Sequence, residues 1–173
     1  MRLVELDAAG LGALAAGVAP EGAALPPGGV APPEVLAILR DALGGGARSW
    51  LAVADGEAVG LCGVKAAPRG ATVEIGYGIA APRRGRGHAT AAVAALLGLL
   101  RAEGIERATA ETEPGNAASE RVLLRAGFRR AGERMGPDGG VRLWWRPLGF
   151  ASGGDPGEDR GEWGETAPKG GCP

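Results

Sequence analysis

The stretch "EIGYGIAAPRRGRGHATAAVAALLGLL", residues 74–100, changes character twice. It begins with the alternation typical of a strand, continues through a loop with three arginines and two glycines, and ends in an alanine- and leucine-rich run. Apolar residues of this run recur at helical spacing, namely Ala89, Val93, Leu96, Leu97 and Leu100. The sequence therefore predicts a strand ending near Ile79, a basic glycine loop, and a long helix beginning near Gly87 or His88.

The basic loop has two interpretations. The start of a helix offers unpaired N–H groups, glycines let a ligand approach the backbone, and arginines add charge-assisted hydrogen bonds, so the stretch suits a diphosphate. Alternatively, it is an exposed loop in a chain that is rich in arginine throughout. Composition alone leaves both interpretations open.

The flanking segments extend the pattern in both directions. Before the stretch we expect a strand over 2–6, a helix capped by Asp7, a Pro/Gly-rich loop over 19–33, a helix beginning at Pro33, and two further strands. After it we expect a strand over 107–113, a helix capped by Asn116, and two strands around the turn "GPDGG". The predicted class is α+β, with the order β-α-α-β-β-β-α-β-α-β-β. Short turns between the three middle strands indicate an antiparallel meander.

The length of 173 residues suits one domain, which we place at residues 1–149. Residues 150–173 are glycine, proline and acid without periodicity, and they are expected to form a flexible tail. The net charge of −1 gives no pull toward nucleic acid or an acidic membrane. Early acids and the lack of a long apolar run argue against a signal peptide or a membrane span, so a cytoplasmic protein is expected.

Two residue types exclude several chemistries. Cys62 and Cys172 are the only cysteines, which supports neither a disulfide framework nor a zinc site. His88 is the only histidine, which excludes Ser-His-Asp and Cys-His catalysis and any multi-histidine metal site. No metal is expected.

Two phosphate-binding loops compete with this interpretation. A P-loop needs Gly-Lys followed by Ser or Thr, and the chain has none. In a dinucleotide-binding fingerprint, Gly85 and Gly87 would supply the first two glycines, and Glu111 would be the acid that holds a ribose. Thr90 replaces its third glycine, however, and a meander precedes the loop instead of a βαβ unit. Dinucleotide binding stays as a remote alternative.

The run from Glu74 to Phe128 resembles the GNAT N-acetyltransferase family. The acetyl-CoA motif of that family reads Arg or Gln, two residues, Gly, one residue, Gly or Ala, and "RGRGHA" fits it with Arg84, Gly87 and Ala89. Together with "AETEPGNAASERVLLRAGF", the run looks like the branch with ribosomal-protein N-terminal acetyltransferases and many small-amine acetylators. The resemblance implies the GNAT fold, a mixed, mostly antiparallel sheet flanked by helices, with acetyl-CoA as co-substrate.

The resemblance also implies the coenzyme contacts. The strand edge at Ile79, Ala80 and Ala81 would pair the pantetheine amides, and Asn116 and Ser119 would reach the arm from the other side. Asn116 is equally a good helix cap. The diphosphate would lie on Arg84, Gly85, Arg86, Gly87, His88, Ala89 and Thr90. The strands of Glu74 and Glu111 would splay apart around the thioester, and His88 is interpreted as a packing residue or a phosphate contact.

Acetyl transfer to an amine needs a group that accepts a proton, because alkyl amines are mostly protonated at neutral pH. Glu74 is the first candidate base, since on an alternating strand it shares a face with Gly76 and Gly78, where space is left for substrate. Glu111 is the second. Either carboxylate has the alternative role of binding a cationic substrate or an arginine.

The leaving thiolate needs a proton, which many family members supply from a tyrosine on the following helix. That helix has none here, Tyr77 is the only tyrosine, and Ser119 is the candidate donor. The expected acceptor is a small-molecule amine or a peptide or protein N-terminus, bordered by the loop 19–33 and the strand with Trp144 and Trp145. An acetyl-CoA sensor without catalysis is the alternative function, and a homodimer is left open.

Overall fold

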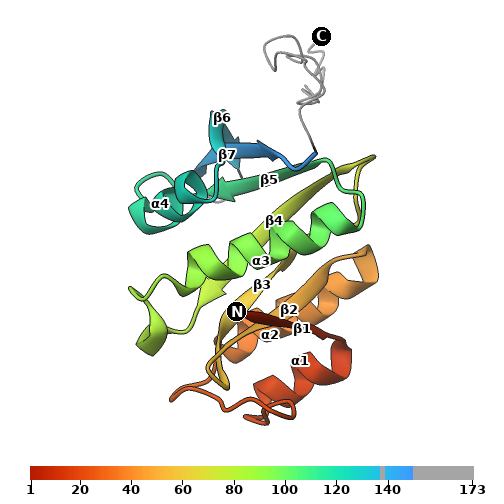
Figure 1. Ribbon diagram of the computed structural model, residues 1–173, viewed down its shortest axis with the longest axis vertical. Helices are drawn as coiled ribbons and strands as arrows, with labels where there is room; N and C mark the ends of the chain where they lie inside the picture. Colours follow the sequence, from red (N-terminus) through yellow and green to blue (C-terminus); the bar gives the residue numbers. More distant parts are fainter. Residues whose placement is uncertain (137–138, 150–173) are drawn as a thin grey trace, which may run out of the picture.

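The computed structural model describes residues 1–136 and 139–149, and its elements follow the predicted order (Figure 1). The strands are β1 (Arg2–Leu6), β2 (Arg48–Ala54), β3 (Glu57–Val64), β4 (Thr72–Ile79), β5 (Arg107–Thr112), β6 (Arg129–Gly136) and β7 (Gly139–Pro147). The helices are α1 (Ala8–Ala15), α2 (Pro33–Ala42), α3 (His88–Ala102) and α4 (Ala117–Arg125), with short 3₁₀ turns η1 (Leu43–Gly45) and η2 (Ala81–Arg83). The predicted tail, 150–173, and part of the turn "GPDGG" lie outside the described residues.

The strands form one sheet in the order β1-β2-β3-β4-β5-β7-β6. All neighbouring pairs are antiparallel except β4 and β5, which are parallel and joined through α3. This arrangement confirms the mixed, mostly antiparallel sheet and the meander of β2, β3 and β4.

The parallel pair β4 and β5 is joined over a short length only. Thr72–Glu74 pair with Arg107–Thr109, whereas β4 continues to Ile79 and β5 continues to Thr112. Beyond the paired residues β4 stays with β3 and β5 stays with β7. The two strands therefore diverge in the middle of the sheet, as the resemblance to the GNAT family implies.

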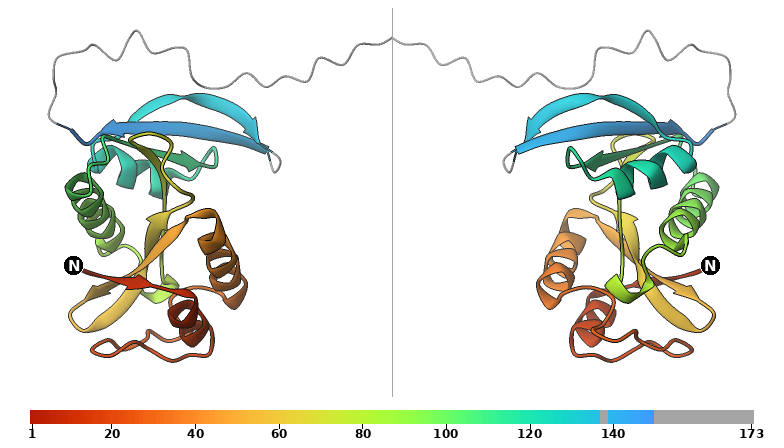
Figure 2. Two further views of the ribbon diagram at one scale, coloured as in Figure 1. Left: turned by 90° about the vertical axis from the view of Figure 1, so that its right-hand side faces the viewer. Right: turned by 90° about the vertical axis from the view of Figure 1, so that its left-hand side faces the viewer.

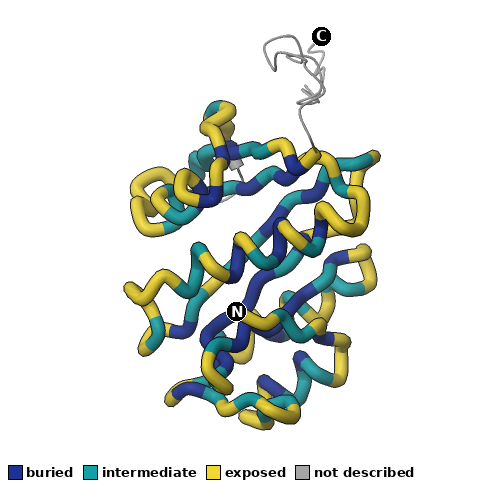
Figure 3. Tube along the Cα trace, in the orientation of Figure 1, coloured by how far each residue is buried: buried dark blue, intermediate teal, exposed yellow. Residues whose placement is uncertain are grey.

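Helices cover both faces of the sheet, and each face has its own core. Figure 2 shows α3 and α2 on opposite sides of the central strands. The core under α3 and α4 includes Trp50, Ile75, Leu96, Leu123 and Trp144, and the core under α1 and α2 includes Leu11, Leu36, Leu51, Val53 and Leu61. Figure 3 shows the buried residues running along the central strands between these layers. Alternation along β2 divides its side chains between the two cores.

Local signals in the sequence set the ends of the helices. The Asp7 carboxylate accepts from the N–H of Gly10 at 2.7 Å and caps α1, and Pro33 occupies the first turn of α2. After α4, Gly127 adopts φ +80° and Phe128 returns its N–H to the Leu123 carbonyl at 2.9 Å. Among the described residues, no helix combines the length and the apolar character needed to cross a membrane.

Close backbone approach inside the sheet leads to a stability prediction. A Cβ at Gly60 would lie 2.2 Å from the Gly78 carbonyl oxygen and 2.9 Å from the Ile79 Cα, so Gly60→Ala should destabilise the fold by about 2 kcal/mol. Gly98, exposed within α3, has open space around its Cβ position, and Gly98→Ala should stabilise by about 0.5–1 kcal/mol. Urea unfolding of both variants measures the two changes, and equal effects of the same sign would contradict the packing argument.

Candidate active site

The basic loop after β4 turns sharply through two glycines. Gly85 and Gly87 have φ values of +76° and +79°, a region that favours glycine, and Gly87 is the N-cap of α3. A Cβ at either position would meet no atom within 4 Å, so the space beside both is open. The loop thus presents bare backbone at the start of a long helix.

The first turn of α3 begins beside this loop with N–H groups that have no acceptor within the helix. The first bond of the helix runs from the Ala91 N–H to the Gly87 carbonyl at 3.1 Å. The N–H groups of His88, Ala89 and Thr90 precede it and have no acceptor within the helix. With the positive end of the helix dipole, they form a surface suited to an anion.

The arginines of the loop have different tasks. Arg83, which the sequence analysis did not single out, donates from Nε to Glu57 Oε2 at 2.6 Å, and this pairing lowers the pKa of Glu57 and raises that of Arg83. Arg83 thereby fastens the loop to the start of β3. Arg84 donates from Nε to the Ile79 carbonyl at 3.0 Å, and Arg86 is exposed. Arg84 and Arg86 are thus the exposed arginines of the loop.

The expected strand edge at Ile79, Ala80 and Ala81 is partly engaged within the protein. Besides the contact of Arg84 with the Ile79 carbonyl, the Ala80 N–H donates to the Val59 carbonyl at 3.0 Å. Ala81 begins the 3₁₀ turn η2. A pantetheine arm would thus find fewer open backbone groups here than the sequence suggests.

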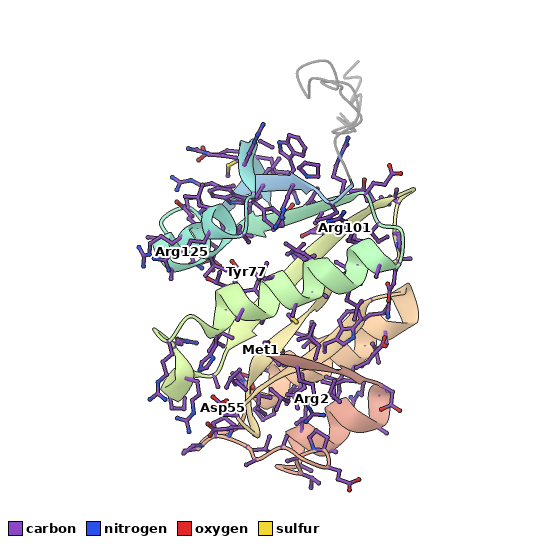
Figure 4. All side chains as sticks on the ribbon, viewed as in Figure 1. Met1, Arg2, Asp55, Tyr77, Arg101 and Arg125 are labelled. Carbon is purple, nitrogen blue, oxygen red and sulfur yellow. The ribbon has the colours of Figure 1, made fainter. Side chains whose placement is uncertain are left out.

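His88 lies in the wall of an open cavity of about 530 Å³. The cavity is also lined by Met1, Arg2, Gly22, Val53, Ala54, Asp55, Gly56 and Ala91. Figure 4 shows Met1, Arg2 and Asp55 on the N-terminal side of the molecule, beside β1 and the β2–β3 turn. His88 therefore contributes to a hollow next to the basic loop, a position compatible with either of its predicted roles.

Glu74 faces Lys65 across the β3–β4 pair. The Lys65 N–H donates to the Glu74 carbonyl at 2.9 Å, and the Lys65 Nζ forms an ion pair with Glu74 Oε1. Apart from this ion pair, Oε1 is closed off from solvent and has no partner among the described residues. The open space predicted beside Glu74 is only partly there, because a Cβ at Gly76 would lie 3.8 Å from the Lys65 Cε, whereas Gly78 borders open space.

Glu111 lies on the same face of the sheet. Glu74 is in register with Thr109, and Glu111 follows two residues later on β5, where the strands have begun to diverge. Its Oε1 accepts from Arg134 Nη2 at 2.6 Å and from Arg134 Nε at 3.2 Å. The structure therefore brings the two predicted carboxylates to one face and gives each an intramolecular cation.

Asn116 and Ser119 meet at the start of α4. The Asn116 Oδ1 accepts from the Ser119 N–H at 3.1 Å, which confirms Asn116 as the cap of this helix. Its side-chain oxygen is thereby committed to the fold.

Tyr77 is a further candidate that the sequence analysis passed over. Strand alternation turns its side chain away from the Glu74 face, and it packs against the core under α3 and α4. Figure 4 shows Tyr77 between these two helices. Its hydroxyl donates to the Ser119 carbonyl at 3.0 Å, and burial raises its pKa. Strand alternation already places Tyr77 opposite Glu74, so the signal was present in "EIGYG".

Other reactive groups do not contribute to this site. Cys62 is buried, and burial raises the pKa of its thiol to about 12, so it is a poor nucleophile. Within residues 1–136 and 139–149, no cluster of three or more His, Cys, Asp or Glu side chains is placed to hold a metal ion.

Comparison with known families decides the assignment. A family model described as "Acetyltransferase (GNAT) domain" matches residues 19–129. The chain belongs to the GNAT acetyltransferase family. A search of curated proteins finds no match. With this fold, the dinucleotide-binding alternative is not supported, because the basic loop follows a meander of antiparallel strands and not a βαβ unit.

Solved GNAT structures resemble the chain over most of its length. Mycobacterium smegmatis RimJ in complex with CoA-disulfide is 30% identical, with a TM-score of 0.57 over 66% of this chain and 60% of that chain. The aminoglycoside acetyltransferase AAC(6′)-Ib in complex with coenzyme A is 20% identical, with a TM-score of 0.61 over 84% and 93%. A GNAT acetyltransferase from Streptococcus pneumoniae is 16% identical, with a TM-score of 0.60 over 86% and 100%. The last two show the fold alone.

The glycine loop leads to a binding prediction for this GNAT domain. Acetyl-CoA should raise the thermal midpoint, because a ligand that binds only the folded state stabilises it. Gly87→Leu should abolish the shift, since a side chain there enters the open space beside the free N–H groups. Gly104→Leu is the matched control: Gly104 has φ +85° and equally open space, but it follows the other end of α3. Both variants should lose stability through strain, and a normal ligand shift in Gly87→Leu would disprove the role of the loop.

Proposed function

We propose that the protein is an acetyl-CoA-dependent N-acetyltransferase that moves an acetyl group to a primary amine by direct attack within a ternary complex. One observation carries the proposal: Glu74 and Tyr77 lie on opposite faces of β4 where this strand separates from β5. A reacting thioester held between the diverging strands would have a carboxylate on one side and a hydroxyl on the other. These are the groups that amine attack and thiolate departure require.

The basic loop suits the coenzyme. Open space at Gly85 and Gly87, the free N–H groups of the first turn of α3, and the exposed Arg86 together fit a diphosphate. When bound, acetyl-CoA supplies the activated acetyl group. Residues 1–149 would form the catalytic domain, and the poorly reactive Cys62 favours direct attack over an acetyl-cysteine route.

Glu74 is the better base of the two carboxylates. The side chains of Lys65 and Arg134 are equally exposed, at 50%, so only the kind of contact separates the two carboxylates. The Lys65 ammonium is a compact charge on a flexible stem and exchanges partners readily when an acceptor amine arrives. Glu111 is held by two hydrogen bonds from the fork of Arg134, a geometry that is harder to exchange. We therefore assign proton acceptance to Glu74 and binding of the acceptor region to Glu111.

Tyr77 is the better donor of a proton to the leaving sulfur. The case for Tyr77 is its position: its hydroxyl lies on the face of β4 opposite Glu74, and the contact with the Ser119 carbonyl directs it to the start of α4. Ser119 remains the second candidate, because its hydroxyl belongs to the same turn. Tyr77 would thus take the role that a tyrosine on the following helix has in many family members.

The second candidate function is a domain that binds acetyl-CoA without catalysis. The ion pair of Lys65 with Glu74 favours this second function, because it occupies the proposed base when no substrate is bound. Both functions require binding of acetyl-CoA, so only turnover separates them. Acetyl transfer to any amine in a broad panel would decide for the enzyme, and binding without transfer would decide for the sensor.

Replacing the base gives the first catalytic prediction. Glu74→Gln keeps the shape of the side chain and removes the proton acceptor, so kcat should fall by about 10²-fold at neutral pH while acetyl-CoA affinity stays level. Raising the pH should restore part of the rate, because the free form of an amine with a pKa of about 8–10 becomes more abundant. Steady-state rates against pH test this, and superimposable profiles for variant and parent would remove Glu74 from the mechanism.

The second catalytic prediction separates the two hydroxyls. Tyr77→Phe should lower kcat by about 10²-fold with little change in the KM for acetyl-CoA, because only the departing sulfur loses its proton donor. Ser119→Ala is the matched variant, since it removes the neighbouring hydroxyl and retains the carbonyl that accepts from Tyr77. A large loss in Ser119→Ala with a nearly normal Tyr77→Phe would reverse the assignment.

A further inference from the structure

Lys65 is unusual in this chain. Lysine occurs only at positions 65 and 169, whereas arginine is abundant, and Lys65 is the cation that contacts the proposed base. A lysine ammonium is a compact charge on a flexible stem, which exchanges partners more readily than the fixed fork of arginine. The choice of lysine at this position therefore has a chemical consequence.

The stem of Lys65 lies along the acceptor side of β4. Lys65 and Glu74 are direct cross-strand neighbours, and the stem passes over Gly76, as the 3.8 Å separation of its Cε from a Cβ at that glycine shows. The ammonium then lies against Glu74 Oε1, which is enclosed. The position that an acceptor ammonium would take on the base is thus occupied by a side chain of the protein.

Both predicted carboxylates on this face have a cation partner within the protein. Glu74 is paired with Lys65, and Glu111 is paired with Arg134. A polycationic acceptor requires carboxylates without partners, and here each of the two brings a cation that would repel it. A substrate with one ammonium and an adjacent carboxylate or carbonyl oxygen is not repelled. Its ammonium replaces Lys65 on Glu74, and its oxygen offers Lys65 a new partner.

We propose that Lys65 selects the acceptor, and that the acceptor class is an α-amine with a neighbouring carboxylate or carbonyl, as in an amino acid or a peptide N-terminus. This inference rests on the proposed function. The acceptor ammonium displaces Lys65 from Glu74, and the Lys65 ammonium pairs the acceptor oxygen. Glu74 takes one proton from the ammonium, the N–C bond forms as the C–S bond breaks, and the departing sulfur takes a proton from Tyr77. The acylated nitrogen gives up its second proton to solvent, Tyr77 regains a proton from solvent, and Glu74 releases its proton when the product leaves. Lys65 is a positioning residue, not a proton carrier.

The test compares four acceptors on the full chain. Tyrosine carries the carboxylate, tyrosinamide the carbonyl, tyramine neither, and spermine is a polycation; all rates are expressed per free amine. The parent protein should prefer tyrosine or tyrosinamide, and the order of those two distinguishes a free amino acid from a peptide. Lys65→Met should raise the KM for both by about tenfold, the value of one charged hydrogen bond, with kcat nearly unchanged, and should improve tyramine.

Two further variants make the result specific. Lys65→Arg should retain the order of the acceptors, since the charge is kept. Arg130→Met removes an ion-paired cation of similar exposure, 51%, whose cross-strand neighbour Trp144 is buried in the core on the opposite face, and it should leave the order unchanged. If Lys65→Met fails to fold, Lys65→Gln, which removes the charge and keeps a polar side chain, replaces it with the same expected changes in KM.

The results that would overturn the inference are of two kinds, and they have different consequences for the proposed function. A parent protein that prefers spermine or tyramine, or a Lys65→Met variant that slows all four acceptors equally, refutes selection by Lys65 and leaves the acetyltransferase intact. Binding of acetyl-CoA without transfer to any acceptor contradicts the proposed function, and the inference falls with it.

Discussion

The candidate site depends on one constraint, the short parallel pairing of β4 and β5. Three residues of each strand are in register before β3 draws β4 to one side and β7 draws β5 to the other. A parallel pair needs a crossover, and α3 provides it, so the helix begins close to the end of β4. The free N–H groups of that helix, the open glycines and the diverging strands therefore share one region. Any shift in the pairing of β4 with β5 would move the helix N–H groups, the glycines and the diverging strands together. The site therefore depends on the arrangement of the sheet more than on any single sequence motif.

Alternation along β4 gives the proposed chemistry its two sides. Glu74 shares its face with Gly76 and Gly78, while Tyr77 points into the core under α3 and α4. In the proposed reaction the acceptor amine approaches from the Glu74 face and the sulfur leaves toward Tyr77. A one-residue slip of this strand would exchange the faces, burying the carboxylate and exposing the phenol. The antiparallel pairing with β3, where Gly60 admits no side chain, opposes that slip.

The sequence predicts most of the fold and only part of the site, for a physical reason. The helix caps at Asp7 and Asn116, the glycine loop and the α3 face are set by residues close in the chain, so local patterns suffice. The contacts of Arg83 with Glu57, of Tyr77 with Ser119 and of Arg134 with Glu111 join residues more than 20 positions apart. Those depend on strand register and on how helices cross the sheet, which alternation alone does not specify. The same limit explains Gly76: its missing side chain is readable from the sequence, but the lysine stem above it is not.

The cations paired with the two glutamates suggest that these carboxylates have different roles. A carboxylate that changes partner in every turnover needs a cation that leaves without breaking a directional geometry, and the lysine ammonium meets that need. A carboxylate that shapes the acceptor region needs the opposite, and the two hydrogen bonds from Arg134 hold Glu111 in one place. If the two cations were exchanged, the arginine would release Glu74 slowly, and the lysine would hold Glu111 less firmly in the acceptor region. In the proposed enzyme, the difference between lysine and arginine at these positions thus supports the order in which the sequence ranks the two carboxylates as candidate bases.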